Sequence, residues 1–182
     1  MKRIVTFFAV LFLVTLPRII QADQLVPLTI RQLTDHSQLI IQGAVLNKSC
    51  QRDPAGRIYT KVELEVRDVW KGALTNRIFT VVHSGGILGD RKATVSNQVE
   101  FDIGEELVAF LVVNQRGEGV SLGLAQGKFH VWLESATQQK FVCNPFHGNP
   151  ASVANVRTVQ RVASSGFLTL AELKDRVCGD SR

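Results

Sequence analysis

The sequence lacks any block of basic residues. Its 21 Lys and Arg outnumber its 16 Asp and Glu, for a formal net charge of +5, but the cations are spread along the chain. Lys2, Arg3 and Arg18 lie in the first 22 residues, where no acid occurs, so the remainder carries a net charge of only +2. A surplus this small and this dispersed argues against nucleic-acid binding through a basic patch.

Cysteine is also scarce, with only Cys50, Cys143 and Cys178. A structural zinc site needs four ligands, usually in two closely spaced pairs. His130, Cys143 and His147 lie near one another in the sequence, but no second pair accompanies them. We therefore predict no metal site, and nothing in the sequence indicates a cofactor.

Three disulfide pairings are open to three cysteines in an exported chain. We favour Cys143–Cys178, because both residues lie in the irregular or helical C-terminal third, where a crosslink fastens a tail to the body. The alternatives are unpaired, buried thiols or an odd cysteine that pairs with a partner chain.

No catalytic constellation stands out either. Asp35-His36-Ser37 has the residue types of a triad, but three consecutive side chains cannot assemble as one. Ser84 lacks the surroundings of a nucleophile elbow. Gly85-Gly86 lacks the lysine and hydroxyl of a phosphate-binding loop, so a turn that only glycine fits is the simpler interpretation. Glu105, in Gly104-Glu105-Glu106, is expected to accept backbone N–H bonds at a turn. An acid–base role would need a second carboxylate held near it in space, which the sequence alone does not position.

The apolar run at residues 4–16 follows Lys2 and Arg3. It is too short for a membrane-spanning helix, which needs about 20 apolar residues. Together with Ala22 as a small residue at a cleavage point, it is typical of an export signal. We predict a signal peptide over residues 1–22 and a periplasmic or secreted mature protein, the alternative being an uncleaved anchor.

The chain after residue 22 lacks helices at the spacing of parallel βαβ units. Two short helices are predicted, near residues 30–36 and 170–178. Each begins with a capping box, and a glycine ends the second; the residues concerned are Thr29 with Gln32, Thr169 with Glu172, and Gly179.

The middle of the chain has the pattern of strands. Val62, Leu64 and Val66 alternate with charged residues, as in an antiparallel strand with one wet face. Gly43 indicates a bulge or bend, and residues 107–113 are apolar on both faces, as in a fully buried strand. The expected strands are 39–46, 61–67, 78–82, 107–113, 120–124, 128–133 and 140–142.

These strands predict a mainly β fold: a small OB-like closed or partly open antiparallel barrel with a short N-terminal helix and a C-terminal helix. The predicted organisation is a signal peptide (1–22), an OB-like β-barrel domain (23–143) and an irregular tail with a terminal helix (144–182).

A long loop at residues 84–99 interrupts the strands. Loops longer than about 12–15 residues are usually functional or disordered. The candidate binding residues are therefore Gly85, Gly86, Ile87 and Leu88 in this loop, with Trp70 and Trp132 at strand ends as stacking platforms. For Trp70 the competing interpretation is a core position that closes the barrel end.

Eight short motifs follow one another between residues 28 and 133. They are Ile41-Gln42-Gly43, Ile58-Tyr59-Thr60, Val62-Glu63-Leu64-Glu65-Val66, Trp70-Lys71-Gly72, Gly85-Gly86, Phe101-x-x-Gly104-Glu105, Phe110-Leu111 and Gly123-x-x-Gln126-Gly127-Lys128-Phe129. Their order and spacing resemble a family of exported bacterial β-barrel domains.

The first half of the chain is also similar to the netrin/tissue-inhibitor-of-metalloproteinase module, an OB-type five-stranded barrel. This resemblance implies a barrel fold and no activity. Tissue inhibitors chelate a protease's zinc through an N-terminal cysteine. Cleavage after Ala22 leaves Asp23 at the N-terminus, and the first cysteine is Cys50, so that mechanism does not carry over.

The leading hypothesis is an exported, non-enzymatic binding domain that contacts a protein or a cell-envelope component, with no nucleic acid and no membrane span after signal cleavage. The alternative is an inhibitor or accessory of a secreted protease that acts without zinc chelation. A hydrolase that uses His83 or Ser84 is the third hypothesis.

Overall fold

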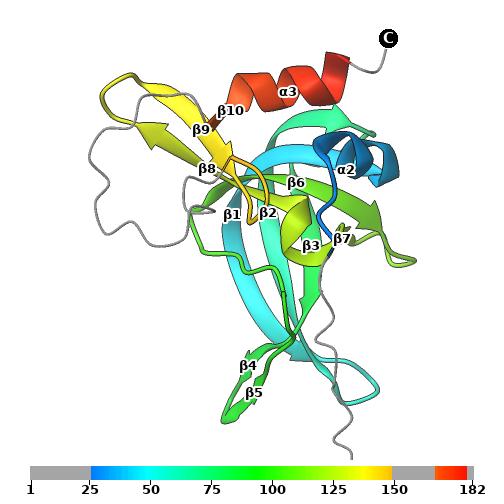
Figure 1. Cartoon of the computed structure of the whole chain (residues 1–182). Coiled ribbons are helices and arrows are strands. Elements are labelled where there is room, and N and C mark those ends of the chain that lie inside the picture. Colours follow the sequence, from blue (N-terminus) through cyan, green and yellow to red (C-terminus); the bar gives the residue numbers. More distant parts are fainter. Residues whose placement is uncertain (1–25, 149–166, 180–182) are drawn as a thin grey trace, which may run out of the picture.

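A computed structural model of the chain describes residues 26–148 and 167–179. The predicted signal over 1–22, with its cleavage point at Ala22, and most of the predicted irregular segment lie outside these residues. Within them the protein is mainly β, with a short helix near each end (Figure 1). The elements are α2 (Ile30–His36), β1 (Leu39–Arg52), β2 (Ile58–Lys71), β3 (Ile78–Ser84), β4 (Gly86–Leu88), β5 (Arg91–Ala93), β6 (Glu106–Val113), β7 (Gly119–Ser121), the 3-10 helix η1 (Leu124–Gly127), β8 (Lys128–Glu134), β9 (Gln139–Cys143), β10 (Leu168–Thr169) and α3 (Leu170–Gly179).

The large sheet curls round until β1 pairs with both β2 and β6. Five strands, in the order β1-β2-β3-β7-β6, therefore form a ring, which β8, β9 and β10 extend to one side. The ring is weakest between β3 and β7, which run parallel and share the single pair Val81–Gly119. The predicted mainly β fold with a partly open barrel and two helices is confirmed.

Gly43 allows β1 to take part in both pairings. The register of β1 against β2 shifts between Gln42 and Gly43. A Cβ atom at Gly43 would collide with the backbone carbonyl oxygen of Glu65 on β2. The predicted bend is thus a site where two backbones approach too closely for any side chain.

The core has two parts, separated by β1 and β6. Five consecutive residues of β6, from Leu107 to Leu111, are buried. Leu107, Ala109 and Leu111 point into the ring, whereas Val108 and Phe110 point outward against the helices. The prediction that this strand is buried on both faces is confirmed.

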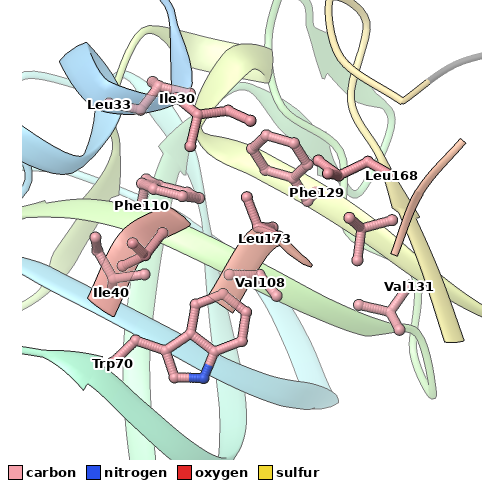
Figure 2. Close-up of a cluster of buried hydrophobic side chains, with 12 residues drawn as sticks. Ile30, Leu33, Ile40, Trp70, Val108, Phe110, Phe129, Val131, Leu168 and Leu173 are labelled. Atoms are coloured by element: carbon pink, nitrogen blue, oxygen red, sulfur yellow. The ribbon is translucent and has the colours of Figure 1, made fainter. Parts of the chain in front are cut away.

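Both helices cover the outer face of the barrel (Figure 1). Ile30 and Leu33 of α2 and Leu173 and Val177 of α3 share one apolar cluster with Phe110 (Figure 2). The predicted capping boxes are present: Thr29 and Gln32 satisfy each other's backbone N–H, and Thr169 and Glu172 do the same. No helix of the described residues is long and apolar enough to cross a membrane.

Three expectations about local structure need correction. The segment 84–99 is not all loop, because β4 and β5 form a hairpin within it. The strand expected at 120–124 ends at Ser121, where Gly123 and Leu124 adopt left-handed backbone angles and turn the chain into η1. The favoured Cys143–Cys178 disulfide is not formed, because all three cysteines are free.

The packing around α3 explains the missing crosslink. The Cys178 thiol lies 3.9 Å from the backbone oxygen of Trp70, whereas Cys143 pairs in register with His130 on β8. Apolar packing therefore fastens α3 to the barrel without a disulfide.

Candidate functional site

The β4–β5 hairpin stands apart from the large sheet and extends from the barrel end opposite the helices (Figure 1). Leu88 and Arg91 form the last pair before the tip. Ile87 has 62% of its surface exposed, and Arg91 and Lys92 beside it are exposed as well. Four of the predicted binding residues, Gly85 to Leu88, therefore lie together in one projecting element.

The base of this hairpin is closely packed. Gly86, at φ +136°, lies so near β1 and β2 that a Cβ atom would come within 2.6 Å of both the Thr60 hydroxyl and the Cys50 thiol. The Thr60 hydroxyl donates a hydrogen bond to the Gly85 carbonyl at 2.8 Å, and the Gly85 amide donates to Ile58 at 2.9 Å. The Gly85-Gly86 pair thus fixes the direction of the hairpin, and it is a turn that only glycine fits.

A hollow of about 690 Å³ lies on one side of the hairpin base. Apolar residues of β3, β7 and the segment after β5 line it, together with Tyr59 and two arginines; the key residues are Val82, Val120, Val95, Tyr59, Arg57 and Arg116. The guanidinium carbon of Arg116 lies 5.8 Å from the centre of the Tyr59 ring. The hollow combines an apolar lining with cations and an aromatic ring, as binding sites commonly do.

A second hollow, of about 550 Å³, also borders the hairpin base and is lined by Lys48, Cys50, His83 and Phe101 among others. His83 stacks on Phe101 with ring centres 5.8 Å apart, and burial lowers the pKa of His83 below its ordinary value. Its Nδ1–H donates to the backbone carbonyl of Ser84 at 3.0 Å. His83 and Ser84 are therefore linked through the backbone, and this bond does not activate the serine hydroxyl.

Glu105 forms a charged cluster at the start of β6. Its carboxylate lies 2.6 Å from Lys128 Nζ and 3.0 Å from His130 Nδ1, and it accepts the Asp102 amide N–H at 3.1 Å. Burial acts to raise the pKa of Glu105, but the bonds from Lys128 and Asp102 outweigh it and lower the pKa below its usual value. The expected structural role of Glu105 is confirmed.

The two predicted tryptophans lie away from the hairpin and from each other. Trp132 is half-buried on β8, where it stacks on His130 and on Phe141. Trp70 belongs to the outer core beneath α3, beside Ile40, Val108 and Leu173 (Figure 2). The core interpretation of Trp70 therefore accounts for its position, and the structure does not bring either indole to the hairpin.

Metal ligands do not gather in the described part of the chain, where no group of three His, Cys, Asp or Glu side chains is arranged to hold an ion. Cys143 and His147, spaced like ligands in the sequence, serve other purposes. Burial raises the pKa of the Cys143 thiol, while His147 Nε2 donates to the Leu28 carbonyl at 2.7 Å.

Sequence reasoning missed the larger hollow. Arg57 and Arg116 both line it although they are far apart in the chain, and Val82 and Val120 line it from β3 and β7, which share a single pair. Only the turn chemistry around Asp53 and Gly56 gave a local signal near it.

No protein-family model matches the chain, and no curated protein matches it. The family resemblance remains a prediction, and a function for this protein has to be argued from its geometry.

Proposed function

We propose that this protein is an exported, non-enzymatic domain that binds another protein through the β4–β5 hairpin. One observation carries the proposal: the hairpin presents an exposed isoleucine in the middle of β4, while its base is hydrogen-bonded to the barrel. The signal-like first 22 residues support a location outside the cytoplasm.

The energetics of the hairpin favour a role in binding a partner. An isolated two-stranded hairpin is only marginally stable in water, and this one has three residues in each strand. The order of the hairpin therefore depends on its closely packed base. Its projection from the barrel places Ile87 in solvent and adds nothing to the core. An exposed apolar side chain on a preorganised element binds a partner with little loss of conformational entropy.

The neighbouring charges favour a protein partner. Lys92 pairs with Ile87 and Arg91 with Leu88, and the side chains of these two cations form no ion pair within the described residues. An apolar centre with a charged rim is the usual composition of a protein-protein contact.

The test is photo-crosslinking in cells from a residue analogue placed at Lys92, followed by mass spectrometry to identify the partner. Replacing Ile87 and Leu88 with Asp is expected to reduce the crosslinked product at least tenfold, because a central apolar contact is commonly worth more than about 1.4 kcal/mol.

Ile78→Asp provides the matched control. Ile78 is also an exposed isoleucine, 57% exposed, but it begins β3, at the other end of that strand from the hairpin. Its crosslinking should equal that of the unmodified protein. Unchanged crosslinking in the Ile87/Leu88 variant would show that the hairpin is not the contact.

A further inference from the structure

The edge of β3 is left open beside the larger hollow. On one side β3 pairs with β2 along its whole length, from Ile78 to Ser84. On the other side it meets β7 only at Val81. The last three residues of β3, about 10 Å of strand, therefore have no neighbouring strand on that side among the described residues.

The register shows which backbone groups this edge presents. The Gly85 amide bonds to the Ile58 carbonyl, so Ile58 and Gly85 are a hydrogen-bonded pair. Pairs alternate along antiparallel strands, and the residues of the next, non-bonded pair turn their N–H and C=O groups away from each other. Tyr59 and Ser84 are that pair. The same holds two pairs further on, for Lys61 and Val82. The Ser84 N–H and the Val82 C=O consequently point away from β2, toward the open side.

This edge lies in a recess with a chemically distinct lining. Val82, Ser84 and Val120 contribute to the hollow of about 690 Å³, which Ala93 and Val95 also line. Ser84 is exposed. Natural sheets usually protect open edges with lysine, proline or a covering segment. Residues 82–84 include no lysine and no proline.

The charge at the mouth of the hollow indicates what it accepts. The side chains of Arg57 and Arg116 are 81% and 59% exposed, whereas their partners Asp53 and Glu118 are only 16% and 13% exposed. The carboxylates lie beneath and the guanidinium groups face solvent. Each guanidinium has five N–H donors, so donors remain for a further carboxylate.

We propose that an extended, acidic segment of the partner protein adds as a strand to the open edge of β3, with its carboxylates meeting Arg57 and Arg116. This inference rests on the proposed function and deepens it. Only Gly85 separates β3 from β4, so a segment laid along the edge continues directly onto the hairpin. Main-chain bonds then provide affinity, and the arginines select for acidic side chains.

The test uses three labelled nine-residue peptides and fluorescence anisotropy with the mature protein. One alternates Val and Glu, the second alternates Val and Lys, and the third repeats the acidic sequence with every backbone nitrogen methylated. The acidic peptide should bind at least tenfold more tightly than either of the others, because the second lacks the charge and the third lacks the backbone donors.

Protein variants locate the site. Arg57→Glu with Arg116→Glu should reverse the preference so that the lysine peptide binds better. Arg31→Glu with Arg176→Glu is the matched control, because it changes the net charge equally on α2 and α3, at the other end of the barrel (Figure 1); it should leave the preference unchanged. Ser84→Pro, which deletes the edge N–H, should weaken binding of the acidic peptide about tenfold. If that variant does not fold, the variant with Arg57→Glu and Arg116→Glu decides the question.

Equal binding of the acidic and N-methylated peptides would overturn strand addition, as would no binding of any peptide. A dimer that disappears in Ser84→Pro would also overturn it, by showing that a second copy of the chain occupies the edge. These results are distinct from failure of the proposed function, which is read from crosslinking of the Ile87/Leu88 variant.

Discussion

Replacing Trp70 with alanine is expected to lower the free energy of unfolding by about 3–5 kcal/mol, which is the usual cost of removing a large aromatic side chain from a core. Trp70 is only 9% exposed and is packed with Ile40, Val108 and Leu173. Its indole N–H also donates to Asp68 at 3.0 Å. The substitution therefore opens a cavity beneath α3 and loses a hydrogen bond at its rim.

Urea unfolding at pH 7, followed by circular dichroism, measures this loss as a lower midpoint with an unchanged slope. Trp132→Ala is the matched control, because Trp132 is only half-buried and stacks on the exposed ring of His130 and the edge-of-core ring of Phe141. Trp132→Ala should lower the free energy of unfolding by about 1–2 kcal/mol, which is the usual contribution of an aromatic pair together with a partly buried ring. A loss under about 1 kcal/mol for Trp70→Ala would contradict its assignment to the core.

The parts of the fold that the sequence predicted well have local causes. The two capping boxes, whose paired residues are only three positions apart, predicted where α2 and α3 start. The alternation at Val62, Leu64 and Val66 and the continuous apolar run in β6 each report which faces of a strand are buried, because side chains alternate along a strand. The bend at Gly43 has a local cause as well, because Gly43 approaches the backbone of the neighbouring strand within one hairpin.

The features that escaped prediction depend on residues far apart in the sequence. Strands β4 and β5 have three residues each, too few for a periodic pattern. The larger hollow is lined by residues of both β3 and β7, and no local signal specifies that these two strands meet at one pair. The environment of Trp70 is set by α3, about one hundred residues further along the chain. Residue types at 85–88 indicated a candidate binding loop, but not the strand edge beside it.

The cluster around Glu105 leads to the second large effect. Lys128 and Glu105 expose only 14% and 8% of their side chains. Besides the carboxylate, Lys128 Nζ bonds the Glu100 carbonyl at 2.5 Å and lies 5.2 Å from the centre of the Phe101 ring. Lys128 therefore ties the segment before β6 to β8, and it supplies the positive charge that keeps a nearly buried carboxylate ionised.

Lys128→Met is expected to lower the free energy of unfolding by about 3 kcal/mol at pH 7, since removing one partner of a buried ion pair leaves the other charge uncompensated. In the unmodified protein the pKa of Glu105 is lowered, so its stabilisation is present above the ordinary glutamate pKa and is lost as the pH falls through the folded-state value. Without Lys128 burial dominates and the pKa rises, so the penalty is relieved as acid protonates Glu105. The difference between the two proteins should shrink from pH 7 to pH 4.

Unfolding midpoints measured at pH 7, 5.5 and 4 provide the check, and two variants make it specific. Lys140→Met breaks the more exposed pair with Glu106, whose side chains are 39% and 19% exposed, and should cost under about 1 kcal/mol. Adding Glu105→Gln to Lys128→Met removes the buried charge itself, so the double variant should recover part of the loss at pH 7 and show a weaker pH dependence than Lys128→Met alone. An equal loss at all three pH values would mean that Lys128 stabilises the protein through its bond to Glu100 and its packing on Phe101, and not through the charge of Glu105.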